Sequence, residues 1–174
     1  MVEMMVDSVR ISMGNQQRVV ILKDSREERY LFIWIAQDMA MAIAQELQGA
    51  RLQRPLTHDL LKSVISAMGG RVVEVAITEL RDAIYHARIT IEVDGRRIDV
   101  DSRTSDAIAL AVRVKCPIFA DESVLAEAAV VPDEAEPSIS QPGKRQSVTS
   151  ADDLSVYRDF INSLDILDEF DKSD

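Results

Sequence analysis

The sequence predicts an α+β domain with a mainly antiparallel sheet. Residues 83–93 alternate between apolar and polar side chains, and a two-residue turn, Asp94-Gly95, follows them. This combination is typical of a half-buried β-hairpin. Three further segments carry apolar residues at helical spacing: 39–47, 60–68 and 105–114. The predicted order along the chain is βββααβββαβα, in which strands and helices are grouped rather than strictly alternating.

The first 35 residues predict three strands. Residues 9–13 alternate between apolar and polar side chains, residues 14–17 form a turn, and residues 19–22 form a buried strand. Residues 30–35 are apolar at every position. Such a strand is central in its sheet or lies at an interface between subunits.

Two apolar stripes at helical spacing follow, and each is interpreted as the buried face of a helix. Gly49 ends the first helix and Gly69 ends the second, because glycine adopts the left-handed conformation that closes helices. Thr57 is the expected N-cap of the second helix. The first stripe comprises Met39, Ala40, Ile43, Ala44 and Leu47, and the second comprises Leu60, Leu61, Val64, Ile65 and Met68.

The Asp94-Gly95 turn fixes the register of the hairpin, because facing residues must add to 189. The expected apolar pairs are Ile91 with Ile98 and Ile89 with Val100, and the expected polar pairs are Glu92 with Arg97, Thr90 with Asp99 and Arg88 with Asp101. A loop of even length before residue 84 would place odd positions of strand 72–79 opposite even ones. A three-residue loop around Arg81 and Asp82 is therefore expected, with Val73, Val75 and Ile77 on the apolar face.

After the hairpin, residues 105–114 predict a largely buried helix, residues 117–120 a short strand and residues 121–129 a last short helix. Residues 132–150 are rich in Pro, Ser, Gln and Glu and lack an apolar period, so they are interpreted as a flexible linker between a domain at 1–131 and an acidic amphipathic helix at 151–174. That helix either docks on its own domain or binds a protein partner through residues 151–170.

The formal charge of the chain is −10, which argues against a generally basic, nucleic-acid-binding surface. From residue 132 onward there are 11 acidic and 4 basic residues, a net charge of −7, so residues 1–131 carry a net charge of only −3. This charge does not exclude a local basic patch on the domain. Cys116 is the only cysteine, which fits a reducing compartment. The N-terminus lacks a signal-peptide pattern and the apolar runs are too short to span a bilayer, so we expect a cytoplasmic protein with no membrane contact.

Four separated segments resemble the bifunctional nuclease domain family: residues 32–35 (FIWI), 54–61 (RPLTHDLL), 101–110 (DSRTSDAIAL) and 117–119 (PIF). The resemblance covers residues 2–131 and implies a compact, self-associating α+β domain with DNase and RNase activity. The sequence departs from the family pattern at Thr104, where Pro is usual, and near Ala83, where Gly is usual. It also has Ala36, Met39 and Ala40 where the family has Gly and then Glu-Ala, so the carboxylate of that motif is missing.

The first motif supplies groups suited to phosphodiester hydrolysis. His58 and Asp59 fall in the first turn of a predicted helix, and Arg54 and Thr57 precede them. A positioned His can move the proton of an attacking water, and a helix N-terminus favours a phosphate. We therefore expect His58 and Asp59 as catalytic residues and Arg54 and Thr57 as substrate-binding residues.

The second motif adds carboxylates. Asp99 and Asp101 share one face of a strand that leads into Arg103, Ser105 and Asp106 at the start of the next helix. We expect Asp101 and Asp106 as catalytic residues and Arg103 and Ser105 as substrate-binding residues. Any metal ion would be a hard one, Mg²⁺ or Mn²⁺, on the oxygens of Asp99 and Asp101.

Structural roles compete with each of these assignments. Asp59 and Asp106 are placed to complement or cap a helix N-terminus, with Arg103 at the N-cap. Thr104 could itself become that N-cap, and Asp101 could simply pair with Arg88. His86 and Cys116 are interpreted as a surface or subunit-contact residue and a small buried residue.

Two functions therefore remain. The first is a nuclease of low sequence specificity that forms a homodimer or larger oligomer. The alternative is a non-catalytic homo-oligomeric binding or regulatory module, which the acidic charge and the missing carboxylate favour.

Overall fold

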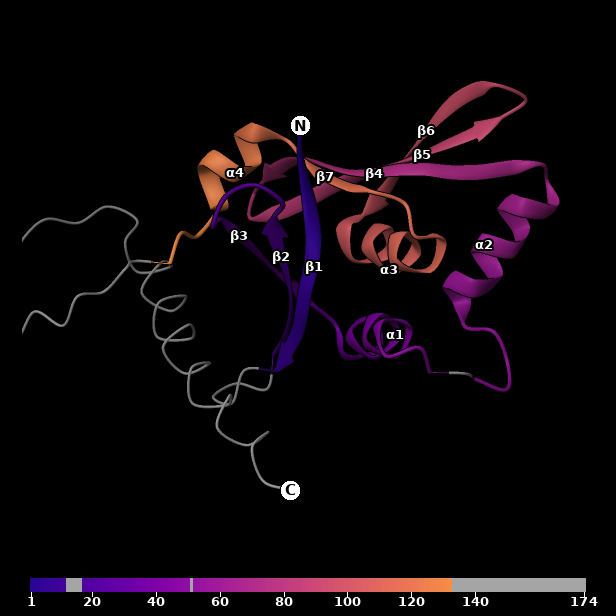
Figure 1. Ribbon diagram of the computed structural model, residues 1–174, viewed down its shortest axis with the longest axis horizontal. Coiled ribbons are helices and arrows are strands. Elements are labelled where there is room, and N and C mark those ends of the chain that lie inside the picture. Colours follow the sequence, from indigo (N-terminus) through magenta and orange to yellow (C-terminus); the bar gives the residue numbers. More distant parts are fainter. Residues whose placement is uncertain (12–16, 51, 133–174) are drawn as a thin grey trace, which may run out of the picture. The chain divides into compact units, whose positions relative to one another are not determined.

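The computed structural model describes residues 1–11, 17–50 and 52–132. Their elements follow the predicted order (Figure 1), so the α+β class is confirmed. The strands are β1 (Val2–Ile11), β2 (Arg18–Asp24), β3 (Tyr30–Ile35), β4 (Gly70–Arg81), β5 (Ile84–Val93), β6 (Arg96–Arg103) and β7 (Ile118–Ala120), and the helices are α1 (Gln37–Leu47), α2 (Thr57–Ala67), α3 (Thr104–Val114) and α4 (Glu122–Ala128).

The seven strands form one sheet in the order β3-β2-β1-β7-β4-β5-β6. All neighbouring pairs are antiparallel except β4 and β7, which are parallel. β7 brings the N-terminal three strands and the β4–β6 meander into a single sheet. Of the two alternatives for residues 30–35, the central position in the sheet is wrong, because β3 is at one end of this sheet. Leu31, Phe32 and Ile33 are nevertheless at most 5% exposed.

The hairpin register is confirmed at every position. The β5–β6 partners include Ile91 with Ile98 and Arg88 with Asp101, and Asp94 and Gly95 have φ angles of 49° and 75°. The described ion pairs of this hairpin do not join directly facing residues of β5 and β6. Arg88 lies 3.6 Å from the diagonal carboxylate of Asp99. Glu92 pairs at 2.9 Å with Arg71, its neighbour on β4.

The expected three-residue loop before β5 is wrong. Arg81 pairs with Ile84, so only Asp82 and Ala83 lie in the turn, both with positive φ. Two bulges restore the match of the apolar faces instead. One bulge lies between Ile77 and Glu79. On the side of this bulge nearer the start of β4, odd-numbered residues face odd-numbered residues, as Val75 faces Ile89. The second bulge, between Val72 and Glu74, places Val72 rather than Val73 opposite Ile91.

Helix α3 is the centre of the core. It packs against α1, α2 and strands β4 and β5, and Ala107 to Ala111 are all at most 1% exposed. α1 lies beside α3 (Figure 1) and buries Met39, Ala40 and Ile43. The prediction of a largely buried third helix is confirmed, with the helix starting one residue earlier than expected.

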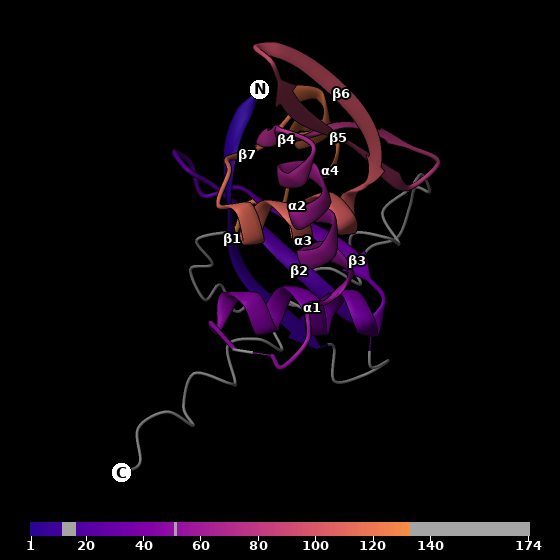
Figure 2. The ribbon, with the colours of Figure 1, turned by 90° about the vertical axis from the view of Figure 1, so that its right-hand side faces the viewer.

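Helix α2 departs from the prediction. Its expected buried stripe faces solvent, with Leu60 57%, Leu61 39%, Val64 45% and Met68 75% exposed. Only Ile65 of that stripe packs against the core. The side of α2 that faces α3 carries His58 instead, which is 7% exposed. Figure 2 looks onto α2 with α1 below it.

Several predictions fall on residues outside the described ranges. They are Met13 and most of the turn at 14–17, nearly all of the linker at 132–150, and the helix at 151–174. Among the described residues, no helix is long and apolar enough to cross a membrane.

Candidate functional site

The N-terminus of α2 is built differently from the prediction. Leu56, not Thr57, is the N-cap residue, with an extended backbone at ψ 173°. The Leu56 amide donates to Oδ2 of Asp59 at 2.8 Å. Asp59 at the N3 position thus satisfies the amide of the N-cap residue, which is one half of a capping box. The capping role weighed for Asp59 is therefore present.

The N-terminus of α3 has Arg103 as its N-cap residue and Thr104 as its first helical residue. The expectation that Thr104 could become the N-cap is wrong. Thr104 is 4% exposed, and its hydroxyl donates to the carbonyl of Tyr85 in β5 at 2.9 Å. The hydroxyl ties the helix start to the sheet, which a proline at this position could not do.

His58, Asp106 and Arg103 form one cluster where α2 and α3 begin. His58 Nε2 lies 3.1 Å from Oδ1 of Asp106, and Arg103 Nε donates to Oδ2 of Asp106 at 2.6 Å. The interpretation of Asp106 as a cap for its own helix is wrong, because its oxygens bind these two side chains. Burial favours a higher pKa for Asp106, but the hydrogen bonds from Arg103 and His58 outweigh it and hold the pKa below its usual value.

A second pair, which sequence reasoning missed, fixes α2 to α3 and α1. Arg113 is 4% exposed, and its Nε donates to Oδ1 of Asp59 at 2.9 Å. Its two terminal nitrogens donate to the carbonyls of Ala109 at 2.8 Å and Ala42 at 3.0 Å. The available signal was a charged residue inside the apolar segment 105–114. A buried guanidinium requires such partners.

The cluster brings together only some of the predicted site residues. Thr57 and Ser105 lie in the first turns of α2 and α3. Arg54 is exposed and lines a hollow of about 330 Å³ together with Asp59 and Arg113. Asp101 is exposed on β6, where it faces Arg88.

The described residues show no preformed metal centre. They contain no group of three or more His, Cys, Asp or Glu side chains placed to hold an ion. One oxygen of Asp99 accepts a hydrogen bond from Thr90 at 2.9 Å, and the other is 3.6 Å from Arg88. Mg²⁺ is usually bound by one or two carboxylates together with waters and substrate phosphates, so Asp99 and Asp101 offer at most the protein part of such a site.

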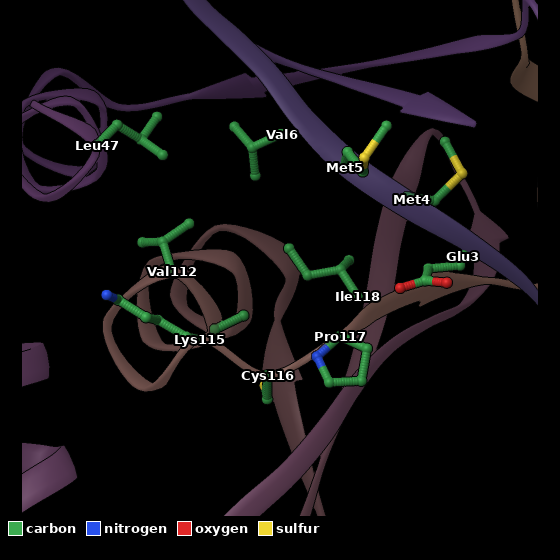
Figure 3. Close-up of a pocket in the computed structure, with 11 residues that line it drawn as sticks. Glu3, Met4, Met5, Val6, Leu47, Val112, Lys115, Cys116, Pro117 and Ile118 are labelled. Atoms are coloured by element: carbon green, nitrogen blue, oxygen red, sulfur yellow. The ribbon is translucent and has the colours of Figure 1, made fainter. Parts of the chain in front are cut away.

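Another hollow lies away from this cluster. It is a groove of about 620 Å³ between β1, the end of α1 and the segment from α3 to β7. Figure 3 shows the residues that line it. None of the predicted site residues lines it. Its surface is mainly apolar, with Met5, Leu47 and Val112 among its residues. Cys116 also lines it, and burial raises the pKa of this thiol to about 11, which keeps it protonated and unreactive at neutral pH.

Fold and cluster together define a class: an α+β domain in which a buried histidine links the first turns of two helices. Comparison with known proteins gives the family. The sequence model of the Bifunctional nuclease domain matches residues 20–133, and the chain belongs to this family.

Two groups of relatives are similar to the chain over most of its length. An uncharacterized protein of Mycobacterium tuberculosis (strain ATCC 25618 / H37Rv) is 36% identical over 163 residues, which cover 93% of this chain and 94% of the relative. Bifunctional nuclease 1 of Oryza sativa subsp. indica is 24% identical over 143 residues, or 80% of this chain and 41% of the rice protein. A bifunctional nuclease of Oryza minuta matches to the same extent.

Proposed function

We propose that the protein hydrolyses phosphodiester bonds of DNA and RNA with low sequence specificity. One observation carries this proposal: His58 and Asp106 are 3.1 Å apart, with the 75% exposed side chain of Arg103 on the other oxygen of Asp106. Membership of a nuclease family supports the substrate class.

In this proposal His58 is the general base. Asp106 orients the imidazole and stabilises its protonated form, as carboxylates beside catalytic histidines do. A water attacks phosphorus as its proton passes to His58, the P–O bond of the ester breaks, and the leaving alkoxide takes a proton from solvent. Arg103 and the first-turn N–H groups of α2 and α3 offset the negative charge that develops on the phosphate oxygens.

We further propose that Asp101 takes part in catalysis and that Asp99 and Asp101 hold a hard ion, Mg²⁺ or Mn²⁺. The cleavage assay described next tests both. We also propose a cytoplasmic location, supported by the single, unpaired Cys116, and self-association, which the family resemblance implies. The predicted partner of residues 151–170 remains a prediction.

The test compares the two histidines of the chain. Cleavage of single-stranded DNA, duplex DNA and RNA is measured with Mg²⁺, Mn²⁺ and EDTA. His58→Ala is expected to lower the rate per folded molecule by at least about 100-fold, the usual contribution of a general base. His86→Ala, on the polar face of β5, is the matched control and should retain full activity.

Undiminished cleavage by folded His58→Ala would mean that the proposed base is wrong. A parallel preparation of this variant also reports contamination, because a contaminating nuclease is unaffected by mutation of the protein under test. Loss of activity in Asp101→Asn would place β6 in the site.

The second candidate is a non-catalytic homo-oligomeric binding module. The observation that favours it is the low exposure of His58, whose side chain is 8% exposed and whose contact with Asp106 also stabilises the packing of α2 on α3. Under this alternative, purified wild-type protein cleaves none of the three substrates under any ion condition, and His58→Ala only lowers the melting temperature.

A further inference from the structure

A polar pocket lies where the segment that leads into α2 passes the end of α3. It has a volume of about 330 Å³, and its walls come from the last turn of α1, residues 52–56, the first turn of α2 and one residue of α3. We call it the α1–α2 pocket. Its polar lining residues are Gln45, Glu46, Gln53, Arg54, Asp59 and Arg113.

Arg113 gives this pocket buried hydrogen-bond donors. Its side chain is only 2% exposed. Its terminal nitrogens Nη1 and Nη2 each have one acceptor, the carbonyls of Ala109 and Ala42. Each of these nitrogens carries two hydrogens, so one N–H on each has no acceptor in the described part of the chain. Because a buried donor without an acceptor is costly, these groups favour a ligand that brings an acceptor atom into the pocket.

Two opposite charges in the pocket are also uncommitted. Glu46 and Arg54 both line it, and neither side chain has an ion pair or a hydrogen bond within the described ranges. Opposite charges that line one hollow without contacting each other leave room for a ligand between them. Such a ligand presents acceptors to the guanidinium and donors to the carboxylate.

The rest of the lining suits a flat ring. Leu52, Pro55 and Leu56 contribute apolar side chains, and Leu52 is 45% exposed. Nucleic-acid bases pack their faces against apolar or aromatic side chains while their edges form hydrogen bonds. The pocket offers both kinds of contact.

We propose that the α1–α2 pocket holds a guanine base of the nucleic-acid substrate. Guanine carries the acceptors O6 and N7, which a guanidinium recognises, and the neighbouring donors N1–H and N2–H, which match the two oxygens of a carboxylate. Arg54 makes the first contact and Glu46 the second. Adenine, cytosine and uracil do not offer a carboxylate two adjacent donor groups.

The pocket is placed to serve the proposed catalytic cluster. Asp59 lines the pocket and directly follows His58, and these two residues contact α3 at Arg113 and Asp106. The two contact points are about 10 Å apart along α3, at 1.5 Å per residue. A base in the pocket therefore brings a phosphate of its own strand toward His58. The choice of a base over another ligand with both donors and acceptors, such as a free amino acid, rests on the proposed function.

The test measures binding without cleavage. The full chain, labelled with ¹⁵N, is titrated by NMR with GMP, AMP, CMP and UMP, which share the phosphate, differ in the base and contain no phosphodiester bond. GMP is expected to bind about tenfold more tightly than the others, within the range of one good bidentate contact. Glu46→Gln should abolish this preference, because one acceptor oxygen becomes a donor. Glu127→Gln, an exposed change on α4, is the matched control and should keep it.

The same spectra report whether each variant is folded. Equal binding of the four nucleotides, no binding of any of them, or a GMP preference that folded Glu46→Gln retains overturns the guanine site, even if the protein cleaves DNA and RNA. Free glycine that binds more tightly than GMP and loses its binding in Glu46→Gln overturns it as well. A GMP preference that depends on Glu46, in a protein that cleaves none of the three substrates, supports the guanine site and contradicts the proposed hydrolysis.

Discussion

The imidazole of His58 and the carboxylate of Asp106 meet at 3.1 Å, although 48 residues separate them in the chain. Each lies in the first turn of its helix, so the contact joins two helix N-termini. The proposed chemistry and the packing of α2 on α3 both depend on this pair.

Removing Arg103 should change the titration of Asp106. In Arg103→Ala the strongest charge-assisted hydrogen bond to the carboxylate is lost while its burial remains, so the pKa of Asp106 is expected to rise. The measurement is a pH titration of the Asp106 carboxyl carbon by NMR. Arg54→Ala is the control and should leave the titration unchanged. A pKa that stays depressed in Arg103→Ala would show that Arg103 does not hold it down.

Breaking the Arg113–Asp59 pair should destabilise the fold. Arg113→Met removes a guanidinium whose side chain is 2% exposed. Loss of one partner of a buried pair costs about 3–5 kcal/mol, and because the Asp59 side chain is 33% exposed we expect about 2–3 kcal/mol. Urea unfolding measures this, with Arg71→Met as the exposed control. In the double variant with Asp59→Asn the two effects should not add.

Thr104 should tolerate proline nearly as well as the native residue. Thr104→Val loses the hydrogen bond to Tyr85 and should cost about 1 kcal/mol. Thr104→Pro loses the same bond, but Arg103 already has φ −63° and ψ 141°, which suits a residue before proline. The lower entropy of the unfolded chain then returns about 0.4–1 kcal/mol. If Thr104→Pro unfolds more easily than Thr104→Val, this account of the helix start is wrong.

Acid should weaken the β2–β3 turn through Asp24. This carboxyl is 1% exposed; burial alone would raise its pKa, but the amide of Arg26 and the guanidinium of Arg29 outweigh that and lower it. Because the folded pKa lies below the unfolded value of about 3.9, the stabilisation is fully present above that pH and is lost as the pH falls through the folded pKa.

The check is the free energy of unfolding measured from pH 6 down to pH 2. Asp24→Asn should be less stable than wild type at pH 6 and should lose stability less steeply below pH 4. Glu127→Gln, an exposed change on α4, should follow the wild-type curve. Parallel curves for wild type and Asp24→Asn would contradict the prediction.

The sequence by itself determined the element order and the β5–β6 register. Both follow from short-range chemistry: the apolar period selects strand or helix, and Asp94-Gly95 permits only one alignment of the strands that flank it. The position of His58 and Asp106 in first turns was likewise readable, because helix starts are local features.

Tertiary structure alone decided which surfaces are covered. An apolar stripe predicts that a helix face is buried, but on α2 the side chains of Leu60, Leu61, Val64 and Met68 are left exposed. The same holds for β3, whose place at the end of the sheet depends on how β7 joins two groups of strands. The bulge before Glu79 and the contacts of Arg113 arise from distant partners as well. Burial and strand pairing between remote segments depend on how the whole chain packs. A local apolar period in the sequence does not identify the segment that packs against it.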